Sequence, residues 1–341
     1  MRKLWSILGI ALPVVLLVMA ITGGTAWAEN PKAGSAGAQF LKIGVGSKYQ
    51  GMAEASVATA NDVYAMYWNP AGLAQVDRWA VGFTNVNYVL DIQLNHFAAA
   101  RYFEDVGVFG ASVTVLSTGD QDVRTVFQQD GTGATYDASS YAIGLSYARQ
   151  LTNYFAFGGS VKYLGEKIGQ VDAKGVALDF GTLLYTGYRS LRVGMSITNM
   201  GPDMTFRGNA LEVPYDSQNG EGSNDPVKAE LATNPYNLPL TFRVGVAYDV
   251  EMSPEAVLTL SSEFKHPNDN EQRASLGAQF AFQDQFFLRG GYKFNYDEET
   301  LALGGGLTTT ISGDTQLYVD YAWQDFGRLE STQRFSLGFT F

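Results

Sequence analysis

The last residues of the chain, Ser331–Phe341 with the sequence STQRFSLGFTF, alternate strictly between two kinds of side chain. One set is mostly large and apolar, and consists of Gln333, Phe335, Leu337, Phe339 and Phe341. The other set is small or polar, and consists of Thr332, Arg334, Ser336, Gly338 and Thr340. Successive side chains of a strand point to opposite faces, so this stretch predicts a strand with one apolar face. A strand of about ten residues that ends in an aromatic residue is typical of outer-membrane β-barrels. We therefore predict that Phe341 is an assembly signal for the barrel assembly machinery.

The N-terminus has the pattern of a secretory signal peptide. Arg2 and Lys3 precede an apolar run over residues 4–20, and Ala26-Trp27-Ala28 forms an A-x-A cleavage site before Glu29. The alternative is an uncleaved membrane anchor, which a proline and two adjacent glycines in the segment disfavour. We predict that residues 1–28 are a cleaved signal peptide.

The composition restricts how the rest of the chain could lie in a membrane. No other apolar stretch approaches the 18 or more residues of a spanning helix. Only helices and closed barrels satisfy every backbone group in lipid, so a membrane-spanning mature protein would have to be a barrel. Charged residues make up only 17% of the chain and cysteine is absent, which excludes disulfides and thiolate metal sites. The net charge of −11 argues against a nucleic-acid partner.

Fourteen segments of alternating character follow residue 78, and each is near the 9 to 11 residues of a tilted membrane strand. They are Trp79–Val89, Ile92–Tyr102, Val106–Leu116, Asp137–Arg149, Tyr154–Glu166, Val171–Tyr185, Leu191–Asn199, Leu238–Val250, Ala256–His266, Gln272–Phe282, Phe286–Asn295, Thr300–Ile311, Thr315–Trp323 and Ser331–Phe341. The sequence thus predicts an all-β fold, a transmembrane antiparallel β-barrel of about 14 strands that occupies residues 77–341.

The connections between these segments support the strand count. Outer-membrane barrels have short periplasmic turns and longer external loops. Every second connection here is short, as at residues 103–105, 150–153, 186–190, 283–285 and 312–314, whereas the long connections 117–136 and 200–237 both fall on the other side. Acidic residues gather in the connections, as at Asp297-Glu298-Glu299, where they could bind divalent cations or simply remain hydrated.

The inward face of the predicted strands is small and partly charged. Its glycines are Gly110, Gly144, Gly158, Gly181, Gly194, Gly245, Gly277, Gly291, Gly304 and Gly338. They indicate either that a second backbone packs inside the barrel or that glycine eases barrel curvature. The inward charges are Lys162, Asp179, Arg192, Arg243, Asp249, Arg289, Lys293, Asp320 and Arg334. They could line a polar path or form an ion-pair network across the lumen that holds a plug, and their mixed signs favour the network.

The segment over residues 29–76 lacks strand alternation and is rich in glycine and alanine. Residues 53–66 could form a short helix, followed by the sequence YWNPAGLA. Proline fixes its own φ and pushes the preceding residue out of helical geometry, and asparagine bonds its own backbone in tight turns. We predict that this segment enters the lumen from the periplasmic side as a hatch, with its turn at Asn69, Pro70 and Ala71 and its aromatic anchor at Tyr67 and Trp68.

The stretch from residue 37, GAQFLKIGVGSKYQGMAEASVATANDVYAMYWNPAGLA, resembles the N-terminal signature of the PorV/PorQ family within the FadL-like superfamily of outer-membrane proteins. The shared feature is the Asn69-Pro70-Ala71 turn. Two positions depart from the pattern: Met52-Ala53-Glu54 stands where the family usually has Met-Gly-Gly, and Asn61-Asp62 stands where two acids are common. The resemblance implies a location in the bacterial cell outer membrane and a hatch folded into the barrel.

The sequence offers no catalytic, metal or cofactor site. Only His96 and His266 exist, without a nucleophile or metal-ligand spacing. The run Gly44–Lys48 faintly resembles a phosphate loop but lacks the GxxxxGK[ST] pattern and a preceding strand. We therefore predict that the protein is not an enzyme and needs no cofactor.

Two functions follow from the resemblance, and in both the barrel is surrounded by outer-membrane lipid. In the first, the protein is a hatch-gated passive port for a hydrophobic small-molecule ligand, with an apolar pocket near the outer loops. The candidate pocket residues, from the connection 202–239, are Met204, Phe206, Leu211, Val213, Tyr215 and Tyr236. In the second, the protein takes part in type IX secretion and binds exported protein cargo.

Overall fold

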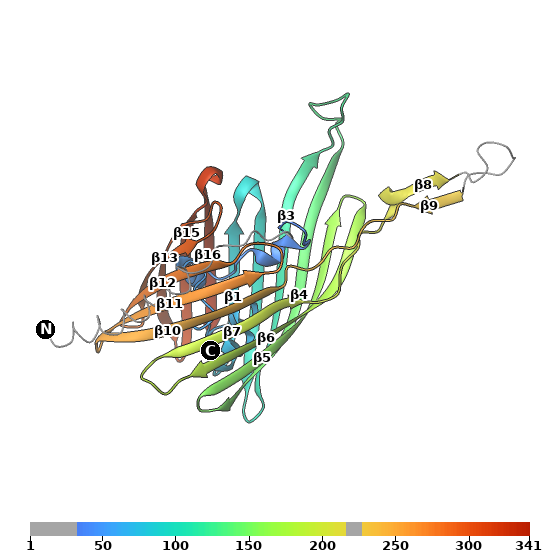
Figure 1. Ribbon diagram of the computed structural model, residues 1–341. Coiled ribbons are helices and arrows are strands. Elements are labelled where there is room, and N and C mark those ends of the chain that lie inside the picture. Colours follow the sequence, from blue (N-terminus) through green and yellow to red (C-terminus); the bar gives the residue numbers. More distant parts are fainter. Residues whose placement is uncertain (1–32, 216–226) are drawn as a thin grey trace, which may run out of the picture.

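The computed structural model describes residues 33–215 and 227–341, and its main body is a closed antiparallel barrel (Figure 1). The predicted signal peptide, the first residues of the predicted hatch and residues 216–226 of the predicted outer connection lie outside the described residues. The barrel strands are β1 (Trp79–Asn87), β2 (Gln93–Phe103), β3 (Gly107–Asp122), β4 (Thr135–Thr152), β5 (Phe155–Ile168), β6 (Val171–Tyr185), β7 (Arg192–Met200), β10 (Thr241–Ser253), β11 (Ala256–Pro267), β12 (Arg273–Phe282), β13 (Phe286–Phe294), β14 (Leu301–Ser312), β15 (Thr315–Asp325) and β16 (Ser331–Thr340).

The strand order confirms the predicted fold. Each barrel strand pairs with its neighbours in the chain, β7 pairs with β10 across the long connection, and β1 closes the barrel against β16. The closure is in register from Ala80 opposite Thr340 to Asn87 opposite Gln333. Because the wall has no free edge, all backbone groups along it can pair within the protein, as hydrocarbon requires.

The predicted outer loops contain more regular structure than the sequence indicated. Both ends of the predicted loop 117–136 continue β3 and β4, whose pairing extends to Asp122 opposite Thr135 and projects beyond the rim. Within the predicted loop 200–237, β8 (Glu212–Tyr215) pairs with β9 (Val227–Glu230) in a separate two-stranded sheet. Polar side chains outside the bilayer face water on both sides of a hairpin, so the apolar alternation that marks a membrane strand is absent there.

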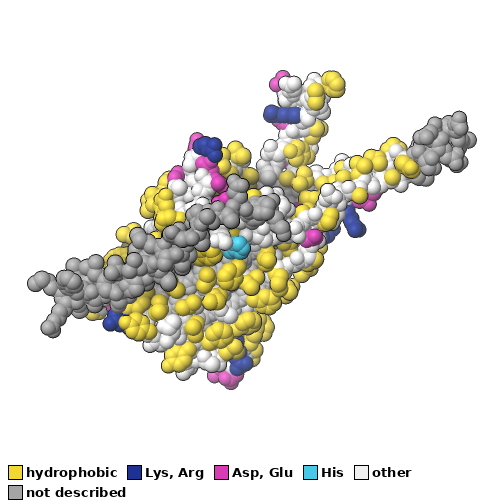
Figure 2. Space-filling view, viewed as in Figure 1, with side chains coloured by type: hydrophobic (Ala, Val, Ile, Leu, Met, Phe, Trp, Pro, Cys, Tyr) yellow, Lys and Arg dark blue, Asp and Glu magenta, His cyan; other side chains and the backbone are white. Residues whose placement is uncertain are grey.

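The outer face of the wall is apolar, as lipid requires. Figure 2 shows hydrophobic side chains covering the barrel between charged groups near its ends. Examples are Phe97 on β2, Leu145 on β4 and Leu288 on β13, whose exposed fractions are 51%, 67% and 68%. Among the described residues, no helix has the length and apolar character to cross a membrane.

The inner face is covered rather than open. Along β1 the even-numbered residues from Ala80 to Val86 are all buried, while their outward neighbours are exposed or half-buried. An empty water-filled lumen would leave such inward residues accessible. They are buried because residues 36–76 run through the barrel and contact its wall.

The segment inside the barrel is built from four short helical turns: η1 (Gln39–Lys42), α2 (Ser47–Gly51), α3 (Ala65–Trp68) and η2 (Pro70–Gln75). The predicted helix over residues 53–66 is wrong, because Ala53 and Glu54 have φ of 53° and 66°, and left-handed residues break a right-handed helix. The outer connections hold the remaining short helices, η3 (Val89–Asp91), η4 (Asn209–Leu211) and η5 (Gly327–Leu329).

The direction of this segment also differs from the prediction. The amide of Gly34 donates to Asp269 and that of Gly37 donates to Asn237, and both acceptors lie in outer connections. The other end leads into β1 at the opposite, short-turn side, where Trp79 pairs with Phe341. Residues 33–76 therefore cross the lumen from the outer side to the periplasmic side, and do not enter from the periplasm and fold back.

Candidate functional site

The interior glycines mark where the lumen segment touches the wall. A methyl group at eight of the ten predicted positions would collide with residues 51–73: Gly110, Gly158, Gly181, Gly194, Gly245, Gly277, Gly291 and Gly304. At Gly277, for example, it would lie 2.5 Å from the carbonyl oxygen of Met52. Gly144 and Gly338 instead make room for the wall side chains of Ser112 and Tyr318. Close backbone approach is thus the main use of these glycines, and the segment and the wall are built to fit each other.

The Asn69-Pro70-Ala71 turn sits against β5 and β6. Asn69 has extended backbone geometry (φ −154°), and its Oδ1 accepts from the Ala71 amide at 3.2 Å, which caps η2. Its Nδ2 donates to the carbonyl oxygens of Val57 at 2.7 Å and Thr182 at 3.0 Å. One side chain therefore ties together the turn, another part of the segment and the wall strand β6. Asn69 is the N-cap of η2, and Pro70 and Ala71 are its first residues.

Tyr67 and Trp68 form the aromatic part of this anchor. Their rings meet edge to face with centroids 4.8 Å apart. Trp68 is fully buried and donates from Nε1 to the carbonyl oxygen of Val45 at 2.8 Å, and Tyr67 donates to that of Leu41 at 2.9 Å. Both rings thereby fix the first half of the segment onto the second.

Most of the predicted lumen charges pair along the wall, and others contact the lumen segment. Lys162 pairs with Asp179 at 2.8 Å, Arg192 with Asp249 at 2.7 Å, and Arg289 with Asp320 at 2.5 Å. Each pair joins strands that are adjacent or one apart in the wall. Neighbouring strands are only about 4.8 Å apart, so ion pairs form along the wall before they span the lumen.

Three of the predicted charges contact the segment itself. Arg334 donates from Nε to the carbonyl oxygen of Gly44 at 3.1 Å. Arg243 lies over the Trp68 ring, 5.3 Å from its centre, and pairs with Glu263 at 3.3 Å. The third is Lys293, whose partner the sequence did not identify.

That partner is Glu54, which the sequence marked only as a departure from the family pattern. Its carboxylate lies between Lys293 at 2.8 Å and Lys265 at 3.3 Å, and all three side chains are buried. Glu54 adopts left-handed backbone geometry (φ 66°), which costs a residue with a side chain about 1 kcal/mol or more. Burial raises the pKa of Glu54, but Lys265 and Lys293 outweigh it, so the pKa stays well below its ordinary value. Glu54 is therefore an ionised link between the segment and strands β11 and β13.

Further polar contacts continue this link along the same half of the wall. Glu263 on β11 accepts from the amides of Ser56 at 2.9 Å and Val57 at 2.8 Å. On β16, the hydroxyl of Ser336 lies 2.9 Å from that of Ser47 and accepts from its amide. Residues 44–57 are thus held to β11, β13 and β16 by hydrogen bonds and ion pairs.

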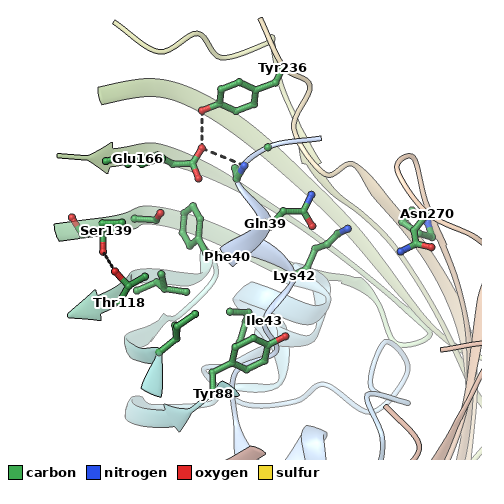
Figure 3. Close-up of a pocket in the computed structure, with 18 of the residues that line it drawn as sticks. Gln39, Phe40, Lys42, Ile43, Tyr88, Thr118, Ser139, Glu166, Tyr236 and Asn270 are labelled. Carbon is green, nitrogen blue, oxygen red and sulfur yellow. Dashed lines mark hydrogen bonds between the residues drawn. The ribbon is translucent and has the colours of Figure 1, made fainter. Parts of the chain in front are cut away.

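Above the segment, at the outer end of the barrel, lies a cavity of about 630 Å³ (Figure 3). Residues 37–43 form part of its floor, and Glu166 on β5 accepts there from the Ala38 amide and the Tyr236 hydroxyl. Of the predicted pocket residues, Phe206 and Tyr236 line the cavity and Met204 is buried beside Phe40 in the adjoining apolar cluster. Leu211, Val213 and Tyr215 do not line it, because they belong to η4 and β8 in the separate hairpin.

The remaining sequence-predicted residues have structural surroundings. Phe341 stacks on Trp79 with centroids 6.3 Å apart at the periplasmic end, and its role in assembly stays a prediction. His96 is buried in β2 with Nδ1 2.8 Å from the Thr114 hydroxyl. In residues 33–215 and 227–341, no group of three or more His, Cys, Asp or Glu side chains is placed to hold a metal ion.

Comparison of the sequence with protein families gives one match over most of the chain. The model of a family described as type IX secretion system protein PorV matches residues 26–267. The chain belongs to the PorV family. A comparison with curated protein sequences gave no match.

The fold of this PorV family member is also that of several solved outer-membrane channels. The toluene transporter TodX of Pseudomonas putida has a TM-score of 0.60 at 12% identity, and the match covers 87% of this chain and 99% of the TodX chain. The toluene transporter TbuX of Ralstonia pickettii has a TM-score of 0.56 at 14% identity, with coverages of 87% and 97%. The CymD monoaromatic hydrocarbon channel has a TM-score of 0.55 at 14% identity, and the match covers 88% of this chain and 98% of CymD. At such identities the likeness shows the fold, and with the family match it places the protein in the bacterial outer membrane.

Proposed function

We propose that this protein is a passive port through which hydrophobic small molecules cross the outer membrane, and that residues 33–76 are its hatch. The observation that carries the proposal is the continuous filling of the lumen by this segment beneath a cavity at the outer end. A cavity with no barrel below it could bind a molecule but could not pass it across the membrane. A barrel without a lumen segment would admit ions and nutrients indiscriminately. The combination suits a port that opens for selected molecules.

The structural neighbours agree with this proposal, because two are described as toluene transporters and one as a monoaromatic hydrocarbon channel. Apolar side chains from η1 and the outer ends of the strands face the cavity, among them Phe40, Ile43 and Leu116. Burial of apolar ligand surface on such side chains is favourable by roughly 25 cal/mol per Å². No energy source is needed if the molecule moves down its own gradient.

A cysteine pair can test the hatch directly, because the natural chain contains no cysteine. We expect Ser47→Cys with Ser336→Cys to form a disulfide, since the two hydroxyls are 2.9 Å apart on the segment and β16. In cells that produce this variant, oxidation should block uptake of labelled toluene and reduction should restore it. Each single-cysteine variant is the matched control. Uptake that ignores the disulfide, or that does not exceed that of cells without the barrel, would refute the proposal.

The family description favours a second candidate, a role in type IX secretion with binding of exported protein. The hairpins β3–β4 and β8–β9 project beyond the rim and could present a protein-binding surface (Figure 1). Purification of the barrel from its own cells, followed by mass spectrometry, would decide this point. Stoichiometric exported protein that is lost when the β8–β9 hairpin is deleted would favour the second candidate.

A further inference from the structure

The outer cavity has two chemically different ends. One end is rich in apolar and aromatic side chains, and Figure 3 shows Phe40, Ile43 and Tyr88 there, together with the Glu166 carboxylate that Tyr236 and the Ala38 amide hold. The other end is lined by charged groups from the outer ends of β11 and β12 and from the connection after β13, including Lys265, Arg273 and Glu299. A neutral hydrocarbon would satisfy the first end only.

The cations at the second end are partnered unequally. Lys265, Arg273 and Lys293 lie on the inward faces of three successive strands, with Lys265 directly opposite Arg273 in the β11–β12 register. The buried acids beside them are Glu54, which pairs with both lysines, and Glu299, which pairs with Lys293. Arg273 is thus the one of these three cations that pairs with neither Glu54 nor Glu299, and its ion-pair partner is Asp297 in the connection after β13.

Arg273 is held in place but poorly partnered. Its guanidinium lies 4.3 Å from the centre of the Tyr296 ring, and its side chain is only 15% exposed. Its Nε is buried without a hydrogen-bond acceptor, and its nearest acid, Asp297, is 3.9 Å away and 89% exposed. By contrast, Lys42 at the same cavity has a close ion pair with buried Asp269 at 2.7 Å. Buried charged donors are normally satisfied, so the Nε of Arg273 is a donor that a bound ligand could satisfy.

We propose that the outer cavity binds a small aromatic carboxylate, with its carboxylate on Arg273 and its ring against the aromatic end. This inference rests on the proposed function and names the ligand class of the port. The unpartnered Nε of Arg273 can accommodate one carboxylate, whereas Glu54 and Glu299 nearby would repel a dianion such as phosphate. The planar guanidinium can bind a carboxylate with two parallel hydrogen bonds. The aromatic side chains that line the cavity are Phe40, Tyr88, Phe206, Tyr236 and Tyr296, and rings favour offset or edge contacts with them.

Isothermal titration calorimetry of the full chain purified in detergent tests this assignment with 2-naphthoate and its neutral isostere 2-naphthamide. We expect the parent protein to bind the carboxylate roughly tenfold or more tightly than the amide, as a charge-assisted hydrogen bond allows. Arg273→Gln should remove this preference and leave the affinity for 2-naphthamide unchanged. Arg328→Gln, at an outer-loop arginine that is outside the cavity and paired with Glu298, should keep the preference.

Heat-dependent migration on a gel verifies that each variant is a folded barrel before titration. Equal affinities for 2-naphthoate and 2-naphthamide in the parent, or an undiminished preference in Arg273→Gln, would overturn the proposal. Tight binding of decanoate with no binding of 2-naphthoate would overturn the aromatic part of it. Toluene uptake under redox control would be unaffected by these failures, so the ligand class and the port function are tested separately.

Discussion

The two halves of the wall hold the lumen segment in different ways. On β1–β6, residues 60–76 bury apolar side chains, including Trp68, Leu73 and Ala71, against small wall residues such as Ala98 and Ala156. On β11, β13 and β16, residues 44–57 are held by hydrogen bonds and ion pairs.

This difference indicates which part of the lumen segment can move away from the wall. Apolar side chains in a protein interior are close-packed, so movement of residues 60–76 away from β1–β6 would leave cavities, which are costly. Polar contacts can be replaced by water or by a ligand's own polar groups. We therefore expect residues 44–57 to swing away from β11–β16, with loss of the Trp68–Val45 hydrogen bond, while residues 60–76 stay anchored. The following predictions test this asymmetry.

Deletion of the lumen segment, which removes both its apolar and its polar contacts with the wall, should have the largest effect on conductance. We expect deletion of residues 34–73 to open a large and steady pore, because the wall's backbone hydrogen bonds do not depend on the segment. Single-channel conductance in planar bilayers measures this, and the parent should be nearly closed to ions. If the deleted barrel conducts no more than the parent, something else closes the lumen.

Loss of the charge on Glu54 should open the polar side. Glu54→Gln leaves Lys265 buried without its anion, and breaking a buried ion pair costs about 3–5 kcal/mol. We expect frequent opening events in the same bilayer assay, with an unchanged amount of inserted barrel. Asp62→Asn is the matched control, because its pair with Lys48 at 3.4 Å is more exposed and is worth under about 1 kcal/mol. Equal conductance of the two variants would show that the ion pair does not hold the segment.

The anchored side should loosen when Asn69 is truncated. Asn69→Ala leaves the carbonyl oxygens of Val57 and Thr182 without their donor, which costs about 2 kcal/mol in total. We expect faster proteolysis of the segment, while the barrel remains inserted. Asn61→Ala serves as the control, because Asn61 is exposed and its side chain contacts only the Lys48 ammonium. Protection equal to that of the parent would contradict the anchoring role of this turn.

A methyl group on the wall should produce a smaller displacement. At Gly194 it would meet the Val57 carbonyl, so Gly194→Ala should weaken the closed arrangement by about 1 kcal/mol through overpacking. Gly305→Ala is the matched control, since its nearest contact would be the Phe287 carbonyl oxygen at 3.9 Å. Conductance and proteolysis should change in the first variant only. The fit between wall and segment would be irrelevant to closure if both variants behave alike.

Acidity should have the smallest effect of all. The folded-state pKa of Glu54 is held well below its ordinary value, so its stabilising contribution is complete above the unfolded pKa. It is lost only as the pH falls through the lower folded pKa, which mild acid does not reach. Conductance of the parent should therefore be the same at pH 7 and pH 6. A rise at pH 6 would show that another titrating group controls the polar side.

The sequence by itself determined the barrel, its strand count and the side on which each residue lies. Those properties follow from a period of two within each strand and from the lengths of the turns, which are local features. The Asn69-Pro70-Ala71 turn was also predictable, since proline and asparagine shape the backbone within three residues. The inward glycines indicated a packed lumen but left curvature as an equal explanation.

The tertiary structure alone decided how the lumen is closed. The partners of Glu54 are Lys265 and Lys293, 211 and 239 residues away, and nothing local in the sequence couples them. The direction of the lumen segment depends on backbone bonds to Asn237 and Asp269. The distances between strands also decide that Glu54 and Glu299 pair with the two lysines and leave Arg273 to Asp297. Alternation states which face a side chain occupies, but the closed barrel brings together faces from distant strands, and only their distances decide which charges pair.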